Sequence, residues 1–158
     1  MGDKQLFCIL MIFILCTFLI ALPIVFSDLI EIVIEYEETG AISYEVNGVP
    51  INFGSLQHNT INNPATSPLH IANTGSVSID VSIRAEDFVS GSYFIGIENC
   101  TYNTVNSPGA SSPMSKSYIP ISTVDPAEDL SLYFWVDVPE FQKALSYNSI
   151  IYINVVGV

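Results

Sequence analysis

Residues 77–84 read VSIDVSIR, the cleanest alternation of apolar and polar residues in the chain. Successive side chains of an extended strand point to opposite faces, so the valines and isoleucines from Val77 to Ile83 share one face and the polar residues share the other. A strand with one buried and one solvated face is typical of an antiparallel sheet. This stretch therefore predicts a half-buried strand of such a sheet.

The same two-residue period recurs along most of the chain after residue 28. Residues 130–138, LSLYFWVDV, predict the central strand, with the two leucines, Phe134, Val136 and Val138 on one face. Asn47-Gly48 is typical of a tight hairpin turn, which predicts that the strands before and after it pair with each other. The other predicted strands are residues 29–36, 41–46, 49–53, 69–72, 93–97, 101–105, 118–124 and 149–156.

Two stretches between these strands are predicted to be loops. Residues 54–68 are polar and interrupted by proline, and residues 106–116 are rich in serine, proline and glycine. Residues 139–145 are the only stretch expected to form a short helical turn. The many short strands indicate an all-β fold. We expect a single antiparallel β-sandwich, jelly-roll or immunoglobulin-like, preceded by one N-terminal hydrophobic helix.

Residues 6–26 contain no charged residue and are long enough to cross a membrane as a helix. A hydrocarbon core of about 30 Å is crossed by about 20 apolar residues. Lys4 precedes the segment and acidic residues follow it, which places the rest of the chain outside the cytoplasm. The segment is either a retained anchor or a secretory signal that is cleaved after Ser27. We therefore divide the chain into residues 1–27, signal peptide or transmembrane anchor, and residues 28–158, an extracytoplasmic domain.

The formal net charge is −12, and the chain after residue 27 carries all of it, because only Asp3 and Lys4 are charged before that point. A domain this acidic repels phosphate backbones, which excludes nucleic acid as a partner. Adhesion to anionic lipid head groups is disfavoured for the same reason. Strong acidity on an exported domain fits a solvated surface, salt tolerance or the binding of cations.

The residues that could carry catalysis are few. His58 and His70 are the only histidines, and no G-x-S-x-G nucleophile motif is present. Cys100 is the one cysteine after the apolar segment, and no histidine follows it, which excludes a cupredoxin-type copper site. We expect Cys100 to be a small buried residue or a thiol that pairs between chains. The sequence predicts no catalytic residue, no cofactor and no enzymatic activity.

Calcium is the metal that the acidic stretches fit best, because it binds carboxylate and carbonyl oxygens. Asp125, Glu128 and Asp129 precede the predicted central strand, and Glu86 and Asp87 follow another strand. Neither group matches a calcium-binding loop. We interpret these carboxylates as turn residues at strand ends and assign no metal ligand, with calcium kept as the alternative.

Asn99-Cys100-Thr101 is an N-x-[ST] sequon, the only one in the chain. On an exported domain it predicts N-glycosylation at Asn99. The tyrosines and Trp135 have two interpretations. They line a sugar-binding surface, or they are core and cross-strand neighbours in a sheet, and aromatic residues in strands favour the second.

Several short stretches resemble exported β-sandwich proteins of prokaryotic cell envelopes. They are FGSL (53–56), LHIANTGS (69–76), residues 77–83, DF (87–88), WVDVP (135–139) and YNSIIY (147–152). The nearest family is the camelysin/TasA-type filament subunits, which include archaeal bundling pili, and the resemblance covers residues 50–158. It implies a jelly-roll subunit whose amino-terminal strand completes a neighbour's sheet. Residues 29–36 would be that donor strand, with Ile30, Ile32 and Ile34 on one face.

Type IV pilins also join an apolar amino-terminal helix to a β domain, but the residues before Leu6 lack the pilin cleavage pattern. Two functions from different classes therefore remain. In the first, the protein is a cell-surface structural protein, a subunit or accessory of a filament or envelope layer assembled by strand addition through residues 29–36. In the second, it is a membrane-anchored or secreted binding module for a glycan, a cation or a partner protein. The expected partners are copies of the same chain or other surface proteins, and the membrane if residues 6–26 are retained.

Overall fold

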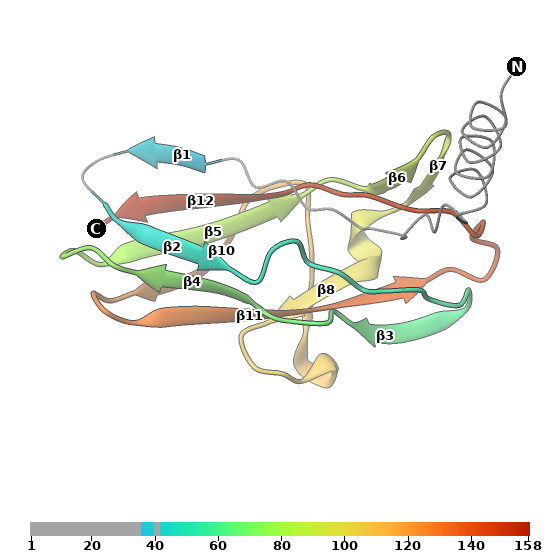
Figure 1. Ribbon diagram of the computed structural model, residues 1–158, viewed down its shortest axis with the longest axis horizontal. Coiled ribbons are helices and arrows are strands. Elements are labelled where there is room, and N and C mark those ends of the chain that lie inside the picture. The colour runs from blue at the N-terminus through green and yellow to red at the C-terminus, as the bar shows by residue number, and fades with distance from the viewer. Residues whose placement is uncertain (1–35, 40–41) are drawn as a thin grey trace, which may run out of the picture.

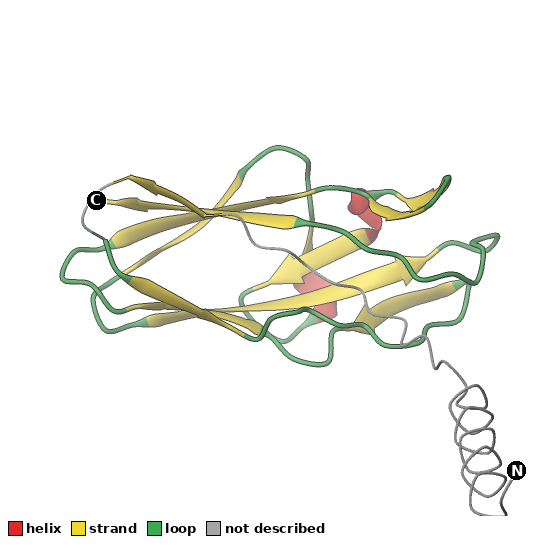
Figure 2. Cartoon of the chain, turned by 45° about the horizontal axis from the view of Figure 1, so that its top comes forward, coloured by secondary structure: helices red, strands yellow, loops and turns green. Residues whose placement is uncertain are grey.

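The computed structural model describes residues 36–39 and 42–158, which form two β-sheets on either side of a hydrophobic core (Figures 1 and 2). These residues contain no α-helix, and their helical turns are η1 (Ile97–Asn99) and η2 (Pro108–Ala110), both of the 3-10 type. The fold is β-sandwich-like. The prediction of an all-β fold built on antiparallel sheets is confirmed.

The first sheet has the strand order β1-β12-β5-β10, and the second has the order β2-β4-β11-β8-β9. The first comprises β1 (Tyr36–Thr39), β12 (Ile151–Gly157), β5 (Ile79–Ala85) and β10 (Ile119–Val124). The second comprises β2 (Tyr44–Asn47), β4 (Leu69–Asn73), β11 (Asp129–Val138), β8 (Cys100–Asn103), β9 (Ser112–Pro113) and β3 (Thr60–Pro64), which also pairs with β11. A separate hairpin joins β6 (Phe88–Ser90) to β7 (Tyr93–Ile95).

The long strand β11 organises the second sheet. Its first half pairs with β4, and its second half pairs with β3 and with β8. The ladders with β3 and β8 overlap at Trp135 and Val136, so these two strands lie on opposite edges of β11. The chain from β3 to β4 therefore follows one edge of β11 as a strand interrupted near Ala65, whose N–H still donates to the Phe134 carbonyl at 2.9 Å.

The core lies between the two sheets and consists of the inward side chains of their longest strands. β5 and β12 contribute every second residue from one side, and β4 and β11 do so from the other. Ile79, Ile83, Leu69, Ile71 and Leu132 are completely buried. Burial of each such side chain stabilises the fold by about 1.5–3 kcal/mol. Burial of the apolar residues that alternate along these strands is therefore the main source of stability.

Most predicted strands are present, with ends shifted by a few residues, but five expectations are wrong. Residues 106–116 are not a continuous loop, because η2 and β9 form within them. Val77 is 41% exposed, because β5 begins only at Ile79. Residues 54–68 are not a continuous loop, because β3 forms within them. Residues 49–53 are not the returning strand of a hairpin, since β2 pairs with β4 instead. Residues 139–145 form turns rather than a helical turn.

The predicted N-terminal helix and residues 29–35 of the predicted donor strand lie outside the described residues. Within the described ranges, no helix has the length and apolar character needed to span a bilayer.

Candidate functional site

The outer edge of β12 is the candidate site for strand addition. On its inner edge, all seven residues of β12 pair with β5 in antiparallel fashion. On its outer edge, β1 pairs with it in parallel, from Tyr36 opposite Ile153 to Thr39 opposite Val156. Every other ladder between described strands is antiparallel. Figure 1 shows β1 and β12 side by side with their arrows pointing the same way.

Among the described residues, the β1 ladder runs from Thr39 back to Tyr36, which lies opposite Ile153, two residues after the start of β12 at Ile151. The preceding chain stays extended along the same line, because Asn148 exchanges backbone hydrogen bonds with Val89 at 2.8 and 3.0 Å and the Ile150 carbonyl accepts from Glu86 at 3.0 Å. A sheet edge is a template for a further strand, and the outer edge of β12 is the edge beside which this chain places β1.

The structure places one residue of the predicted donor strand. Tyr36 begins β1, and its backbone lies opposite Ile153. Ile30, Ile32 and Ile34 lie outside the described residues. The segment that contains them joins β1 at its amino-terminal end, which is the end nearer to Ile151 and Asn148.

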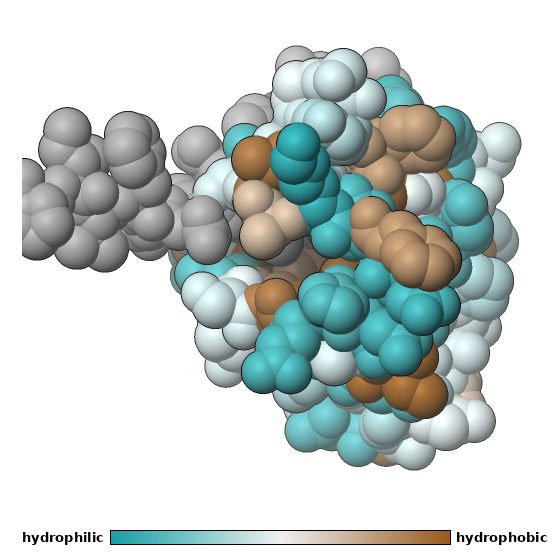
Figure 3. Space-filling model, turned by 90° about the vertical axis from the view of Figure 1, so that its right-hand side faces the viewer, coloured by the Kyte–Doolittle hydropathy of each residue, from teal (hydrophilic) through white to brown (hydrophobic). Residues whose placement is uncertain are grey.

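A cavity of about 410 Å³ opens at this end of the sandwich, and Figure 3 shows the hollowed face. Its walls come from residues 54–58, the β6–β7 hairpin, the end of β11 and residues 142–147. Apolar side chains on these walls are Leu56, Phe88, Ile95, Val136, Leu145 and Tyr147.

Hydrogen bonds fix the loop that borders the cavity. The Tyr147 hydroxyl donates to the Lys143 carbonyl at 3.0 Å and accepts from Gln142 Nε2 at 2.5 Å. Lys143 Nζ donates to the Tyr93 hydroxyl at 3.1 Å and lies 5.0 Å from the centre of the Tyr93 ring. These contacts join residues 142–147 to one another and to β7, so hydrogen bonds hold two walls of the cavity together.

Three of the carboxylates considered for calcium, Glu86, Asp87 and Asp125, have a side-chain partner. Glu86 accepts from Arg84 Nη1 at 2.7 Å, and Asp125 accepts from the Ser78 hydroxyl at 2.7 Å. Asp87 bonds to Lys116 Nζ at 2.7 Å and to the Ile97 N–H at 3.0 Å. The bond to Lys116 lowers the pKa of Asp87 despite its partial burial.

No cluster of three metal-binding side chains occurs in the part of the chain that the structure describes. Asp125 and Glu128 lie in one turn, closed by the Glu128 N–H and the Asp125 carbonyl at 3.0 Å. This turn joins β10 to β11, where Asp129 begins. These residues thus have the positions expected of turn residues at strand ends.

Asn99 is half-buried at the end of η1, immediately before β8. Its side-chain Nδ2 donates to the Gly96 carbonyl at 3.1 Å. The sequon therefore lies on an ordered turn at the start of a strand, and N-glycosylation of Asn99 stays a prediction.

The remaining side chains considered for catalysis or ligand binding are the cysteine, the tryptophan and the two histidines. Cys100 is 2% exposed, and burial together with the charge of Asp137 raises the pKa of its thiol to about 12. Trp135 is 3% exposed, so its ring is not free to stack on a sugar. His70 Nδ1 lies 3.0 Å from the hydroxyl of Ser131, its cross-strand neighbour, whereas His58 lines the cavity.

The pattern of the sequence does not reveal the exposed apolar side chains at this end of the sandwich. Phe141 is 92% exposed and Phe94 is 64% exposed, whereas the alternation pattern directs attention only to inward residues. The sequence does contain one indication of this exposed apolar group: Phe141 is a phenylalanine within the mostly polar stretch that follows Pro139. Comparison with known proteins returns no matching family model, curated protein or solved structure.

Proposed function

We propose that this protein is a non-enzymatic structural protein of an extracytoplasmic surface, a subunit or accessory of a filament or envelope layer. In this proposal residues 29–36 of one copy add as a strand to the outer edge of β12 of the next. The observation that carries the proposal is the parallel ladder between β1 and β12 of the same chain, because it identifies the edge beside which this segment pairs. In the proposed assembly the strand of a neighbouring copy takes that place.

The register of this ladder supports the choice of edge. If the register of Tyr36 opposite Ile153 continues toward the amino terminus, every second pair contains one of the three isoleucines. These pairs are Ile34 with Ile151, Ile32 with Ser149 and Ile30 with Tyr147. The last three acceptor residues are 4%, 5% and 6% exposed, so all face inward. Partner residues on neighbouring strands point to the same face, so an added strand in this register would present its isoleucines to the core.

The arrangement of the strands supports the immunoglobulin-like alternative over the jelly-roll. β2-β4-β11-β8 has the chain order of the A-B-E-D sheet, and β5 with β12 corresponds to the C-F pair of the facing sheet. In that scheme the place beside β12 belongs to a final strand, and here β1 lies there. A strand supplied from before the sandwich is therefore the element that this edge accepts.

The proposed location follows from the apolar segment and the acidity of the chain. Residues 6–26 direct export, and they serve as an anchor if they are retained. Of the five carboxylates considered for calcium, Glu86, Asp87 and Asp125 are engaged with Arg84, Lys116 and Ser78, and Trp135 is buried. These contacts favour the structural protein over a module that binds a glycan or a cation.

The proposal is tested on the full chain recovered from cells, by electron microscopy, size measurement and mass. The variant Ile32→Asp with Ile34→Asp is compared with a matched variant, Glu31→Gln with Glu35→Gln, which changes the opposite face of the same segment. We expect filaments or higher oligomers in the wild type and the control, and monomers in the aspartate variant. A wild type that stays monomeric, or an aspartate variant that assembles normally, would overturn the proposal.

A further inference from the structure

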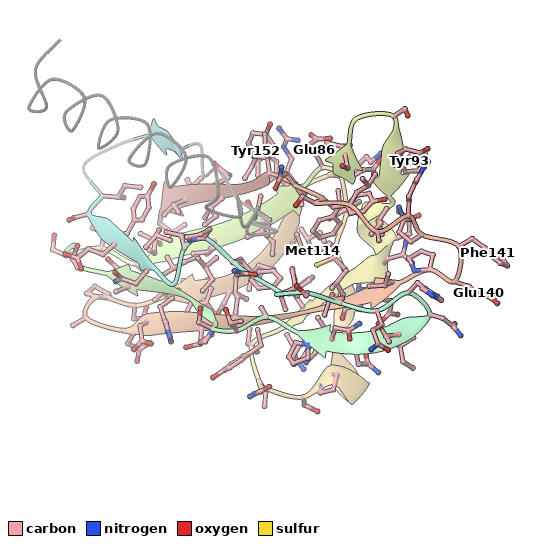
Figure 4. The ribbon with its side chains drawn as sticks, turned by 45° about the vertical axis from the view of Figure 1, so that its right-hand side comes forward. Glu86, Tyr93, Met114, Glu140, Phe141 and Tyr152 are labelled. Carbon is pink, nitrogen blue, oxygen red and sulfur yellow. The ribbon has the colours of Figure 1, made fainter. Side chains whose placement is uncertain are left out.

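The end of the sandwich around the cavity exposes an unusual group of apolar side chains. Their exposed fractions are 92% for Phe141, 72% for Ile61, 64% for Phe94, 52% for Val89 and 42% for Leu145. Figure 4 shows Phe141 projecting outward from its loop, and Figure 3 shows several brown apolar groups among the teal and white ones on the hollowed face. Exposed apolar groups of this kind mark contact with a membrane or with another protein.

These side chains belong to three segments that meet at one end. Val89 and Phe94 lie on the β6–β7 hairpin, which bonds to Asn148 and, through Tyr93, to Lys143. Phe141 and Leu145 lie on the loop between β11 and β12. The Asn59 N–H donates to the Pro139 carbonyl at 3.4 Å, which brings the start of β3 and Ile61 to the same end.

The direction of the chain indicates what covers this end. Because β1 is parallel to β12, the amino-terminal end of β1 at Tyr36 is the end nearer to Asn148 and Leu145. At about 3.3 Å per residue, the ten residues from Phe26 to Tyr36 can span about 33 Å when fully extended. The eight residues from Leu145 to Ile153, the partner of Tyr36, can span only about 26 Å. The chain between residues 6–26, which are apolar enough to cross a bilayer, and Tyr36 is therefore long enough to span the distance to Leu145.

We infer that this end of the sandwich contacts the outer surface of the membrane, with Phe94 and Phe141 inserted at the level of the lipid head groups. The inference rests on the proposed surface location and on retention of residues 6–26. Aromatic side chains with a neighbouring lysine, as at Tyr93 and Lys143, are typical of the interface between lipid and water. Glu140 and the net charge of −12 exclude an anionic surface, so the lipid is zwitterionic or uncharged.

The test uses the full chain in phosphatidylcholine vesicles that contain a lipid spin-labelled near its head group. Single cysteines carry a fluorophore at Phe141→Cys, at Phe94→Cys, at the native Cys16 and at Val77→Cys, with the other cysteines replaced by serine or alanine. Val77 is a matched control, because it is 41% exposed but lies at the opposite end, where the Val158 N–H bonds to Ser78. All three substituted positions are exposed, so the fold is expected to survive.

We expect the head-group label to quench positions 141 and 94, a lipid spin-labelled midway along its acyl chains in a second set of vesicles to quench position 16, and neither label to quench position 77. Quenching at 16 without quenching at 94 and 141 would overturn this inference while leaving the anchor intact. No quenching at 16 would remove the anchor and this inference together, but not assembly by strand addition. A signal at 141 that responds to protein concentration and not to the spin label would indicate contact with another copy and would also overturn it.

Discussion

Asn73 is a polar side chain in the core, only 1% exposed, and it fixes three connections at once. Its Nδ2 donates to the Val77 carbonyl at 2.8 Å and to the Val124 carbonyl at 2.9 Å. Its Oδ1 accepts from the Gly75 N–H at 3.0 Å. The Asn73-Thr74-Gly75 stretch is therefore a turn that joins the end of β4 to the strands of the facing sheet.

Replacing Asn73 by alanine is expected to lower the free energy of unfolding by about 3 kcal/mol, because it leaves buried backbone groups without partners. Thr74→Ala is the matched control, since its hydroxyl bonds only to the exposed Ser43 hydroxyl at 2.8 Å, and it should cost less than about 1 kcal/mol. Urea unfolding of the full chain measures both. Equal losses for the two variants would contradict the role assigned to Asn73.

Asp87 and Lys116 give a prediction about pH. Their ion pair lowers the pKa of Asp87 below its ordinary value, so the pair stabilises the fold above that value and the contribution is lost as the pH falls through the lowered pKa. Lys116→Gln should therefore unfold more easily than the wild type at pH 7, and the two should converge below pH 4. Urea unfolding across this range measures the difference. A difference that does not change with pH would contradict the prediction.

Among the elements, the strands that span the core could be predicted from the sequence. β5, β11 and β12 bury every second residue, and the apolar period of two directly reports that burial. β3 could not be predicted, because TINNP is polar and has no such period. Its pairing depends on distant partners: Asn63 Nδ2 donates to the Val136 carbonyl at 2.8 Å, and the Asn62 N–H donates to Asp137 at 2.6 Å.

The predicted hairpin at Asn47-Gly48 failed for a related reason. Gly48 does adopt a positive φ of 87°, as the local signal indicates, but the chain beyond it buries Ile51 and Phe53 in the core at 1% and 5% exposure. β2 therefore pairs with β4, and burial of two large side chains outweighs the local turn preference.

Gly48 also allows a close approach between β2 and the start of β4. A Cβ atom there would overlap the Pro68 carbonyl oxygen, whereas at Gly54, which also has positive φ, it would meet open space. Gly54→Ala should cost about 1 kcal/mol for its backbone conformation. Gly48→Ala should cost clearly more, and Gly109→Ala, with open space and ordinary φ, should be nearly neutral. Thermal unfolding of the three variants measures this order, and a Gly48→Ala variant as stable as Gly54→Ala would contradict it.

For the whole molecule, the donor strand expected from the sequence stays a prediction, and the sequence did not indicate an acceptor edge. The alternation of residues 29–36 indicates a strand, and the apolar segment before it indicates export. The acceptor edge follows only from the parallel β1–β12 ladder, which brings together residues more than a hundred positions apart. The exposed end with Phe94 and Phe141 could not be predicted from the sequence. The two-residue apolar alternation indicates which face of a strand is buried and says nothing about side chains at the tips of loops.

The central claim is that the edge of β12 receives this strand from a second copy. Glu37 and Asn154 are paired in the β1–β12 register, so cysteines at the two positions are close enough for a disulfide wherever the strand lies on that edge. Two differently tagged full-length chains, one with Glu37→Cys and one with Asn154→Cys and both otherwise free of cysteine, are expressed together and oxidised. The control replaces the second chain by Ser122→Cys, on β10 at the opposite edge of the same sheet.

The measurement is the yield of disulfide-linked dimer that carries both tags. Strand addition between copies predicts a linked dimer with Asn154→Cys and none with Ser122→Cys. The contradicting result is the absence of any linked dimer from the separate variants while a single chain carrying both Glu37→Cys and Asn154→Cys closes an internal disulfide. That result would mean that each copy keeps its own strand.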